Sequence, residues 1–415
     1  VEQVPPPPVD SQGPFQMQIS SLDYSSYVGA IGIGRIQRGS VKTNTPIRLI
    51  DRDGKQRDAR ILQVMRSRGL ERVQVDVASA GDIVAINGIE GIRISDTLCD
   101  PTAVEALPSL TVDEPTVSMS FQVNDSPMSG RDGKYVTSRQ IRERLDRELI
   151  HNVALRVEDT EDPDRFLVSG RGELHLAILI ENMRREGYEI AIGRPQVIVR
   201  DNDGTREEPY EQLTVDVEND TQGAVMELLG ERRGEMQDMT SDGRGRTRVD
   251  YIIPARGLIG FRTDFLTATA GTGLLYHSFS HYGPIKGGPI ATRRNGALIS
   301  MATGKALAYA LFNLQERGRL FIGHADEVYE GMVIGLHSRG NDLTVNPLKA
   351  KQLTNIRAAG TDENLLLTPP IKLTLERAME LIDDDELIEV TPASIRVRKR
   401  YLKEHERRRE ARKAS

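Results

Sequence analysis

Two stretches of the chain share one order of secondary-structure elements, and this repeat constrains the possible folds more than any other feature. In the first stretch, Val117, Met119 and Phe121 alternate as in a strand, and hydrophobic residues from Ile141 onward recur every four positions, as in a helix. The pattern continues with strands at 153–158 and 165–169, a helix at 173–186 and a strand at 196–200. Residues 111–203 are therefore expected to form a split βαβ, or ferredoxin-like, domain.

Residues 204–290 repeat this order with little sequence identity. The pattern predicts strands at 213–217, 236–240, 247–253 and 274–282, and helices at 225–234 and 258–267. Each of the two predicted sheets would carry helices on one face and leave the other face free to meet a partner.

A different pattern precedes the repeat. Residues 15–110 combine short alternating stretches, beginning with Phe15, Met17 and Ile19, with frequent glycine turns, and this combination predicts a small β-barrel. Before it, residues 1–14 contain four consecutive prolines and are expected to form an extended linker.

The last part of the chain predicts a further α+β domain. Residues 291–401 hold helical patterns at 305–316 and 374–382 around a β-rich middle, and residues 402–415 form a basic tail. The predicted fold class is therefore multidomain β and α+β, with domains that are expected to be separable.

Charge is distributed unevenly along the sequence. The chain carries a formal net charge of −6, but residues 396–413 contain ten Lys or Arg and only three Glu. A basic end on an acidic body favours a nucleic-acid partner, although solvated tails have the same composition. No membrane partner is expected, because the longest apolar run, at 306–312, is far shorter than the ~20 residues of a membrane-spanning helix.

Motifs for catalysis, cofactors and metals are missing from the sequence. No Gly-x-x-x-x-Gly-Lys-Ser/Thr phosphate loop occurs, and the single cysteine, Cys99, excludes a disulfide framework. His277 and His281 are four residues apart on a predicted strand, about 13 Å, which is too far to share a metal ion. The sequence therefore predicts no catalytic, cofactor-binding or metal-ligating residues, and a chain that is not an enzyme.

One glycine-rich turn, SGRGELHL at 169–176, has two possible roles. Free N–H groups before the predicted helix could bind an anion. Alternatively, Glu173 could stabilise the helix N-terminus of a tight turn, which is the favoured interpretation.

Several motifs resemble those of the elongation factor G family of translational GTPases. The SGRGELHL motif and the RPQV sequence at 194–197 are similar to signatures of that family's third domain, and residues 32–39 and 80–86 resemble its second-domain barrel. The order barrel, split βαβ, split βαβ is that of domains II, III and V. The remaining block resembles the TypA/BipA branch in the segments 250–261, 323–331 and 338–346.

The resemblance implies the ribosome-facing part of a translational GTPase whose N-terminal GTPase domain, with its GTP and Mg²⁺, is missing from these residues. It also implies a monomeric protein of the bacterial cytoplasm that binds the factor site between the ribosomal subunits. A TypA/BipA-specific C-terminal domain would contact rRNA and the aminoacyl-site tRNA. For the intact protein, roles in large-subunit assembly and in stress or cold adaptation are implied.

Basic residues of the C-terminal block are the predicted RNA contacts. Residues 337–357 show no clear periodicity, and residues 396–400 end a predicted strand in which alternate arginines should share one face. The candidate RNA-binding residues are Arg339, Lys349, Lys351, Arg357, Arg396, Arg398, Lys399 and Arg400. Their cations would neutralise phosphates without reading base sequence. The alternative is a solvated loop and tail.

Two other functions are compatible with the sequence. Exposed sheet faces would suit a protein–protein scaffold, and His324, Asp326 and Glu327 would form the acid–base set of a hydrolase. No nucleophile or orienting group can be named beside that set. Salt-sensitive RNA binding would separate an RNA-binding protein from a scaffold.

Overall fold

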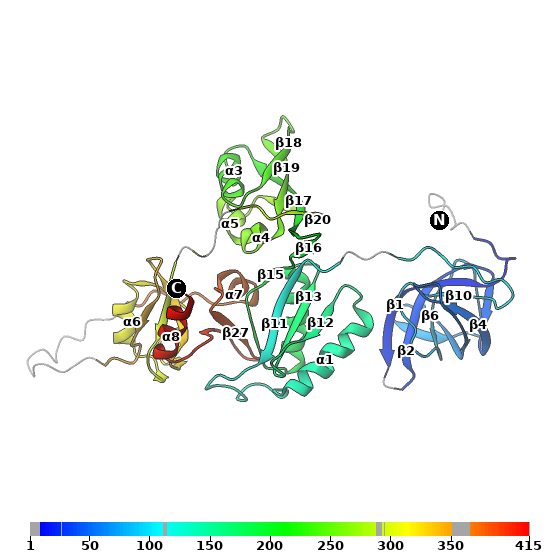
Figure 1. The fold of residues 1–415 in the computed structure, drawn as a ribbon, viewed down its shortest axis with the longest axis horizontal. Helices are drawn as coiled ribbons and strands as arrows, with labels where there is room; N and C mark the ends of the chain where they lie inside the picture. Colours follow the sequence, from blue (N-terminus) through cyan, green and yellow to red (C-terminus); the bar gives the residue numbers. More distant parts are fainter. Residues whose placement is uncertain are drawn as a thin grey trace, which may run out of the picture. The chain divides into compact units, whose positions relative to one another are not determined.

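The computed structural model describes residues 9–25, 27–110, 114–287, 293, 295–350 and 366–414 (Figure 1). The described residues fall into two compact units. The first holds the residues before 114 together with 146–154, and the second holds 114–145 and the residues from 155 onward. No described helix is long and apolar enough to cross a membrane.

The described residues before 114, which make up most of the first unit, form ten strands. They are β1 (Gln16–Ser25), β2 (Gly29–Arg38), β3 (Ser40–Lys42), β4 (Thr45–Ile50), β5 (Gln56–Ile61), β6 (Gln63–Arg68), β7 (Glu71–Gln74), β8 (Val77–Ser79), β9 (Ile83–Asn87) and β10 (Thr97–Cys99). Eight of them form one sheet in the order β5-β4-β10-β1-β2-β9-β6-β7, and β3 pairs with β8. The predicted β-rich fold is confirmed, but backbone pairing among the described residues does not join β5 to β7 into a closed barrel.

The core of this unit follows the predicted alternation. Met17 and Ile19 of β1 are fully buried together with Ile36 of β2, because alternate side chains of a strand point to the same face. Gly34 is required where β1 and β2 pair, since a Cβ atom there would lie 2.0 Å from the carbonyl oxygen of Gln18.

The first split βαβ domain comes next, and all of it except residues 146–154 belongs to the second unit. Its elements are β11 (Val117–Val123), α1 (Ser138–His151), β12 (Arg156–Asp159), β13 (Arg165–Gly170), α2 (Glu173–Glu186) and β14 (Ile190–Ile192). The strand order β12-β13-β11-β14 is that of a ferredoxin-like sheet, as predicted. The predicted fourth strand at 196–200 is wrong: β14 takes that place, and β15 (Gln196–Val197) pairs with the start of β11.

The second split βαβ domain has the same arrangement. It comprises β16 (Arg200–Asn202), β17 (Thr205–Glu218), α3 (Gln222–Glu231), β18 (Glu235–Ser241), β19 (Arg246–Pro254), α4 (Ala255–Leu258), α5 (Phe261–Ala268) and β20 (Leu274–Pro284). Strand pairing gives the order β18-β19-β17-β20, again ferredoxin-like. The single helix predicted at 258–267 is two helices, because Gly260 adopts a left-handed backbone with φ 70° between them.

The C-terminal α+β segment continues the sheet of the first split βαβ domain. Its elements are β21 (Ala297–Ser300), β22 (Gly304–Lys305), α6 (Ala308–Leu314), β23 (Gly318–Leu320), β24 (Glu327–Val328), β25 (Met332–His337), β26 (Leu343–Val345), α7 (Leu375–Leu381), β27 (Glu386–Val390), β28 (Ile395–Lys399) and α8 (Glu404–Ala414). Strand β27 pairs with β14, and the sheet continues as β27-β28-β25-β21-β26. The prediction of separable domains does not fit the first split βαβ domain and the C-terminal segment, because these two parts share one sheet. The predicted basic tail contains a helix, α8.

Candidate nucleic-acid interface

Four of the predicted RNA contacts lie on or next to β28, which is an interior strand. It pairs with β27 on one side and β25 on the other. Only 1% of the Arg398 side chain and 2% of the Lys399 side chain is exposed. Arg396 is largely buried, and Arg400 is exposed just beyond the strand.

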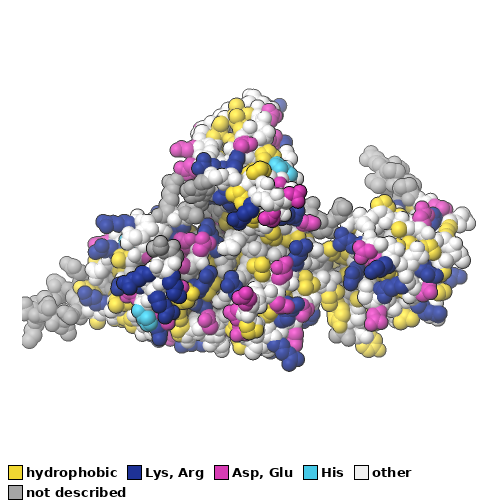
Figure 2. Space-filling view, viewed as in Figure 1, with side chains coloured by type: hydrophobic (Ala, Val, Ile, Leu, Met, Phe, Trp, Pro, Cys, Tyr) yellow, Lys and Arg dark blue, Asp and Glu magenta, His cyan; other side chains and the backbone are white. Residues whose placement is uncertain are grey.

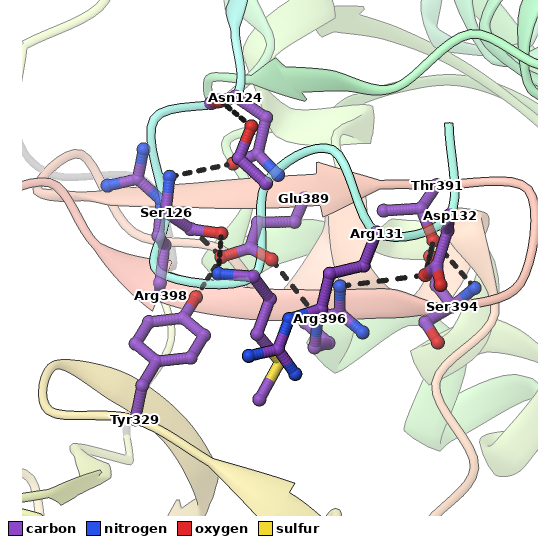
Figure 3. Close-up of polar contacts among 12 residues, drawn as sticks. Asn124, Ser126, Arg131, Asp132, Tyr329, Glu389, Thr391, Ser394, Arg396 and Arg398 are labelled. Atoms are coloured by element: carbon purple, nitrogen blue, oxygen red, sulfur yellow. Dashed lines mark hydrogen bonds and ion pairs between the residues drawn. The ribbon is translucent and has the colours of Figure 1, made fainter. Parts of the chain in front are cut away.

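Arg396 and Arg398 connect β28 to the loop between β11 and α1 (Figure 3). Arg398 forms an ion pair with Asp125 of that loop, and its Nε lies 3.6 Å from the buried carboxylate of Glu389. Arg396 Nε donates to the other oxygen of Glu389 at 3.1 Å, and the hydroxyl of Tyr329 also donates to Glu389. Burial raises the pKa of Glu389, and the two arginines oppose this by favouring its charged form.

A second link runs through Asp132 of the same loop. Its carboxylate accepts a hydrogen bond from the Thr391 hydroxyl at 2.8 Å and lies 3.8 Å from Arg396 Nη2 (Figure 3). These contacts hold the loop of the first split βαβ domain against β27 and β28, which is a structural role for the two arginines.

Lys399 lies among three carboxylates. Its Nζ is 2.6 Å from Asp342, 2.9 Å from Asp385 and 3.0 Å from Glu386. Burial disfavours the charge of Lys399, but these carboxylates together raise its pKa above the usual range for lysine. Glu386 is shared with Arg293, which lies 2.8 Å away.

The prediction that Arg398 and Lys399 contact RNA is therefore wrong for this structure. Their cations are buried and neutralised by carboxylates, so they are not available to phosphate groups. Arg396 is engaged in the same way, and the guanidinium of Arg400 donates to the backbone carbonyl of Asp384 at 2.9 Å. Period-two alternation correctly places Arg396 and Arg398 on one face, but that face is covered by the β11–α1 loop.

The predicted long segment at 337–357 is partly regular. His337 ends β25, and β26 pairs in parallel with β21, so only the turn between β25 and β26 is irregular before 346. Arg339 lies exposed in this turn and Lys349 lies exposed after β26. Lys351 and Arg357 lie outside the described residues.

Two exposed arginines that sequence reasoning did not single out adjoin Arg339. Strand β23 pairs with β25, and the Ser338 N–H donates to the carbonyl of Arg317 at 2.9 Å, which brings Arg317 next to the β25–β26 turn. We call the exposed cations Arg317, Arg319, Arg339 and Lys349 the basic edge. None of the four forms an ion pair with a carboxylate among the described residues. The Arg-Gly-Arg sequence at 317–319 is the sequence feature that could have indicated these two arginines as candidates.

Helix α8 carries further basic side chains, and Figure 2 shows Lys and Arg gathered over it. Several of these charges are paired within the helix: Arg408 lies 2.5 Å from Glu404, and Lys413 lies 2.8 Å from Glu410. The helix is therefore less free to bind phosphate than its composition indicates.

The proposed hydrolase residues do not form an acid–base set. Asp326 accepts a hydrogen bond from the Gly323 N–H at 2.7 Å, and Glu327 lies 2.6 Å from Arg131. His324 is exposed and contacts neither carboxylate through a hydrogen bond or ion pair in the part of the chain that the structure describes.

A different titratable cluster surrounds the glycine-rich turn before α2. The Gly260 N–H donates to the Glu173 carboxylate, and burial, reinforced by the nearby charge of Glu380, raises the pKa of Glu173 to about 7. His277 is hydrogen-bonded to Glu211, which raises the pKa of His277. The carboxylates of Glu173, Glu211 and Glu380 near this turn do not favour the binding of another anion there. The α2 N-terminus has no side-chain cap, so stabilisation of this helix by Glu173 stays a prediction. Among the described residues, no group of His, Cys, Asp and Glu could hold a metal ion.

Three family models of translation factors match successive parts of the chain. The family described as TypA/BipA C-terminal domain matches residues 295–404, elongation factor G C-terminus matches 205–293, and elongation factor Tu domain 2 matches 29–99. The chain is 63% identical over 409 residues to the large ribosomal subunit assembly factor BipA of Escherichia coli K12, covering 99% of this chain and 67% of that protein. The proteins of the same name from Haemophilus influenzae and Buchnera aphidicola are 65% and 55% identical, over 99% of this chain and 66% and 67% of theirs.

Proposed function

The chain belongs to the TypA/BipA family of translational GTPases, and we propose that its C-terminal segment binds ribosomal RNA and the acceptor end of aminoacyl-site tRNA through the basic edge. The observation that carries this proposal is a set of four exposed cations without carboxylate partners in the described chain. Lys and Arg in this state can neutralise phosphates, and they position a protein on RNA without selecting a sequence.

Family membership corrects one prediction. The chain was expected not to be an enzyme because it lacks a phosphate loop. That expectation is wrong, because 99% of the chain matches proteins named BipA and the family is one of GTPases. The matched 409 residues span 67% of the length of the Escherichia coli relative, so the absence of a motif from this chain does not remove the protein from this class of enzymes.

The names of the relatives support a ribosomal partner for this chain. They are called large ribosomal subunit assembly factors, and we extend to this chain a role at the factor site between the subunits and in large-subunit assembly. A monomeric state, a cytoplasmic location and a contribution to stress or cold adaptation belong to the same proposal.

Co-sedimentation with 70S ribosomes over a series of salt concentrations tests the proposed interface. The double variant Arg319→Ala, Arg339→Ala removes two cations of the basic edge. We expect weaker binding and a log–log salt dependence that is shallower by about 0.7–0.9 for each phosphate that the variant no longer neutralises.

The matched control is Lys305→Ala, Lys372→Ala, which removes two exposed cations elsewhere in the same segment. It should bind with nearly unchanged affinity. Equal binding by the two double variants, with equal salt slopes, would show that the basic edge does not touch the ribosome. Strong binding that does not depend on salt would favour the protein–protein scaffold.

A further inference from the structure

A cavity of about 440 Å³ opens beside the basic edge, between α6 and the chain that follows β26. Its polar lining consists of Tyr309, Asn313, Arg317, Asn346 and Lys349. Two of these residues, Arg317 and Lys349, are members of the basic edge. None of the described residues that line the cavity is an Asp or Glu.

The helix side of the cavity has a regular spacing. Tyr309, Asn313 and Arg317 follow one another at intervals of four residues, so they line one side of α6 and the turn after it. The opposite wall is held in place because the Leu307 N–H, at the start of α6, donates to the carbonyl of Pro347 at 3.0 Å. The apolar floor belongs to the core of the C-terminal segment and includes Leu314, Leu343 and Val345.

The two asparagines present complementary hydrogen-bonding groups. Asn313 donates through Nδ2 to the carbonyl of Tyr309 at 2.7 Å, and Asn346 accepts the Leu348 N–H through Oδ1 at 2.9 Å. In the side chains, Oδ1 of Asn313 and Nδ2 of Asn346 have no hydrogen-bond partner in the described chain. The cavity thus offers one acceptor and one donor, the pair of groups that the edge of a nucleobase can satisfy.

We propose that this cavity binds one unpaired nucleotide of an RNA strand, with its base stacked on Tyr309 and its phosphate between Arg317 and Lys349. A stacking ring, amide groups for the base edge and cations for the phosphate are the combination by which proteins hold single-stranded RNA. The volume is within the range of small-ligand sites. This inference rests on the proposed function, because the basic edge would deliver the strand to the cavity.

The test uses the full chain and a fluorescently labelled, unstructured RNA pentanucleotide, followed by anisotropy. Tyr309→Leu removes the ring, and Tyr309→Phe retains it. We expect Tyr309→Leu to weaken binding at least about fivefold, and Tyr309→Phe to stay within about twofold of the natural chain. A blunt-ended RNA duplex, which has no unpaired nucleotide, should bind equally well to both variants.

The result separates the cavity from the basic edge. If Tyr309→Leu binds the pentanucleotide as tightly as Tyr309→Phe does, or if the natural chain does not bind it, the cavity proposal is overturned. Ribosome binding that still depends on Arg319 and Arg339 would then leave the proposed function standing. Melting curves of the two variants show whether a loss of binding comes from unfolding, and a loss by Tyr309→Leu counts for the cavity only when its melting temperature equals that of Tyr309→Phe.

Discussion

Lys399 shows how a cation can be required inside a sheet and be unavailable to a ligand. Its three carboxylate partners come from the turn before β26 and from the segment that leads into β27. Arg398 similarly depends on Asp125, which lies 273 positions earlier. A run of basic residues shows the sign of the charge but not its burial, because the partners are distant in sequence. The candidate contacts on β28 could therefore not be separated from surface cations such as Arg339.

Replacement of Lys399 by Met should destabilise the second unit. The change removes a cation from the buried carboxylate of Glu386 and from the partly exposed Asp342 and Asp385. Breaking a buried ion pair from one side costs about 3 kcal/mol, and because two of the carboxylates reach water and Glu386 keeps Arg293, we expect a loss of about 1–3 kcal/mol. Urea unfolding followed by circular dichroism measures the loss. The exposed neighbour provides the control: Arg400→Met should change the free energy of unfolding by less than about 0.5 kcal/mol. Similar losses for both variants would contradict a buried charge network.

Glu173 should make the stability of the second unit depend on pH. Burial raises the pKa of its carboxyl from 4.5 to about 7, so between these values the folded state binds a proton that the unfolded state has released. The free energy of unfolding should then fall as pH rises through this interval. The pKa of His277 is raised mainly by its hydrogen bond to Glu211, so His277 changes the stability in the same direction. The other charged groups nearby are Glu380, which faces Glu173, and Arg262, which faces His277.

The variant Glu173→Gln keeps an acceptor for the Gly260 N–H and removes the charge. Because the group is partly exposed, we expect a gain in stability of about 1–3 kcal/mol at pH 8 and little change at pH 5. Calorimetric melting between pH 5 and 8 measures both. The exposed Glu161→Gln is the control and should show no such difference. A parallel pH dependence in Glu173→Gln and the natural chain would show that Glu173 does not titrate in this range.

Among the elements, the three-residue strand β14 connects the sheet of the first split βαβ domain to that of the C-terminal segment. It pairs with β11 on one side and with β27 on the other, and Ile190, Ala191 and Ile192 are all buried. Long periodic elements such as α2 were predictable to the residue, because many turns contribute to their signal. A three-residue strand between two glycines has no measurable period, and its second partner lies almost 200 residues away, so neither β14 nor the shared sheet could be predicted.

Replacement of Ala191 by Pro should uncouple the two parts of the shared sheet. Proline has no N–H and fits poorly in an interior strand, so the ladder between β11 and β27 would be interrupted. Hydrogen exchange should show faster exchange in β27 and β28 than in the natural chain. Ala191→Ser, which retains the N–H, should keep their protection. Unchanged exchange in the proline variant would mean that β14 does not join the two sheets.

At the scale of the whole molecule, the order of the domains was recognisable from sequence motifs, but the sheet that joins two of them was not. The two split βαβ sheets and the β-rich first unit follow local periodicity. The continuous sheet of β11 to β14 with β27, β28 and β25 depends on contacts between residues far apart in the chain. The cavity beside α6 was similarly hidden, since Asn346 and Tyr309 approach only through the fold.

The continuous sheet also has a mechanical consequence. Six strand-to-strand steps separate β11 from β26, a lever arm of about 29 Å at the usual spacing of ~4.8 Å. Backbone pairing joins every two neighbouring strands along this path, so a rotation of β11 can be passed from strand to strand. A tilt of about 10° at β11 then sweeps the far end through about 5 Å, roughly the separation of neighbouring strands. Small rotations at one end of the sheet are thereby magnified at Arg339 and Lys349, which lie at the other.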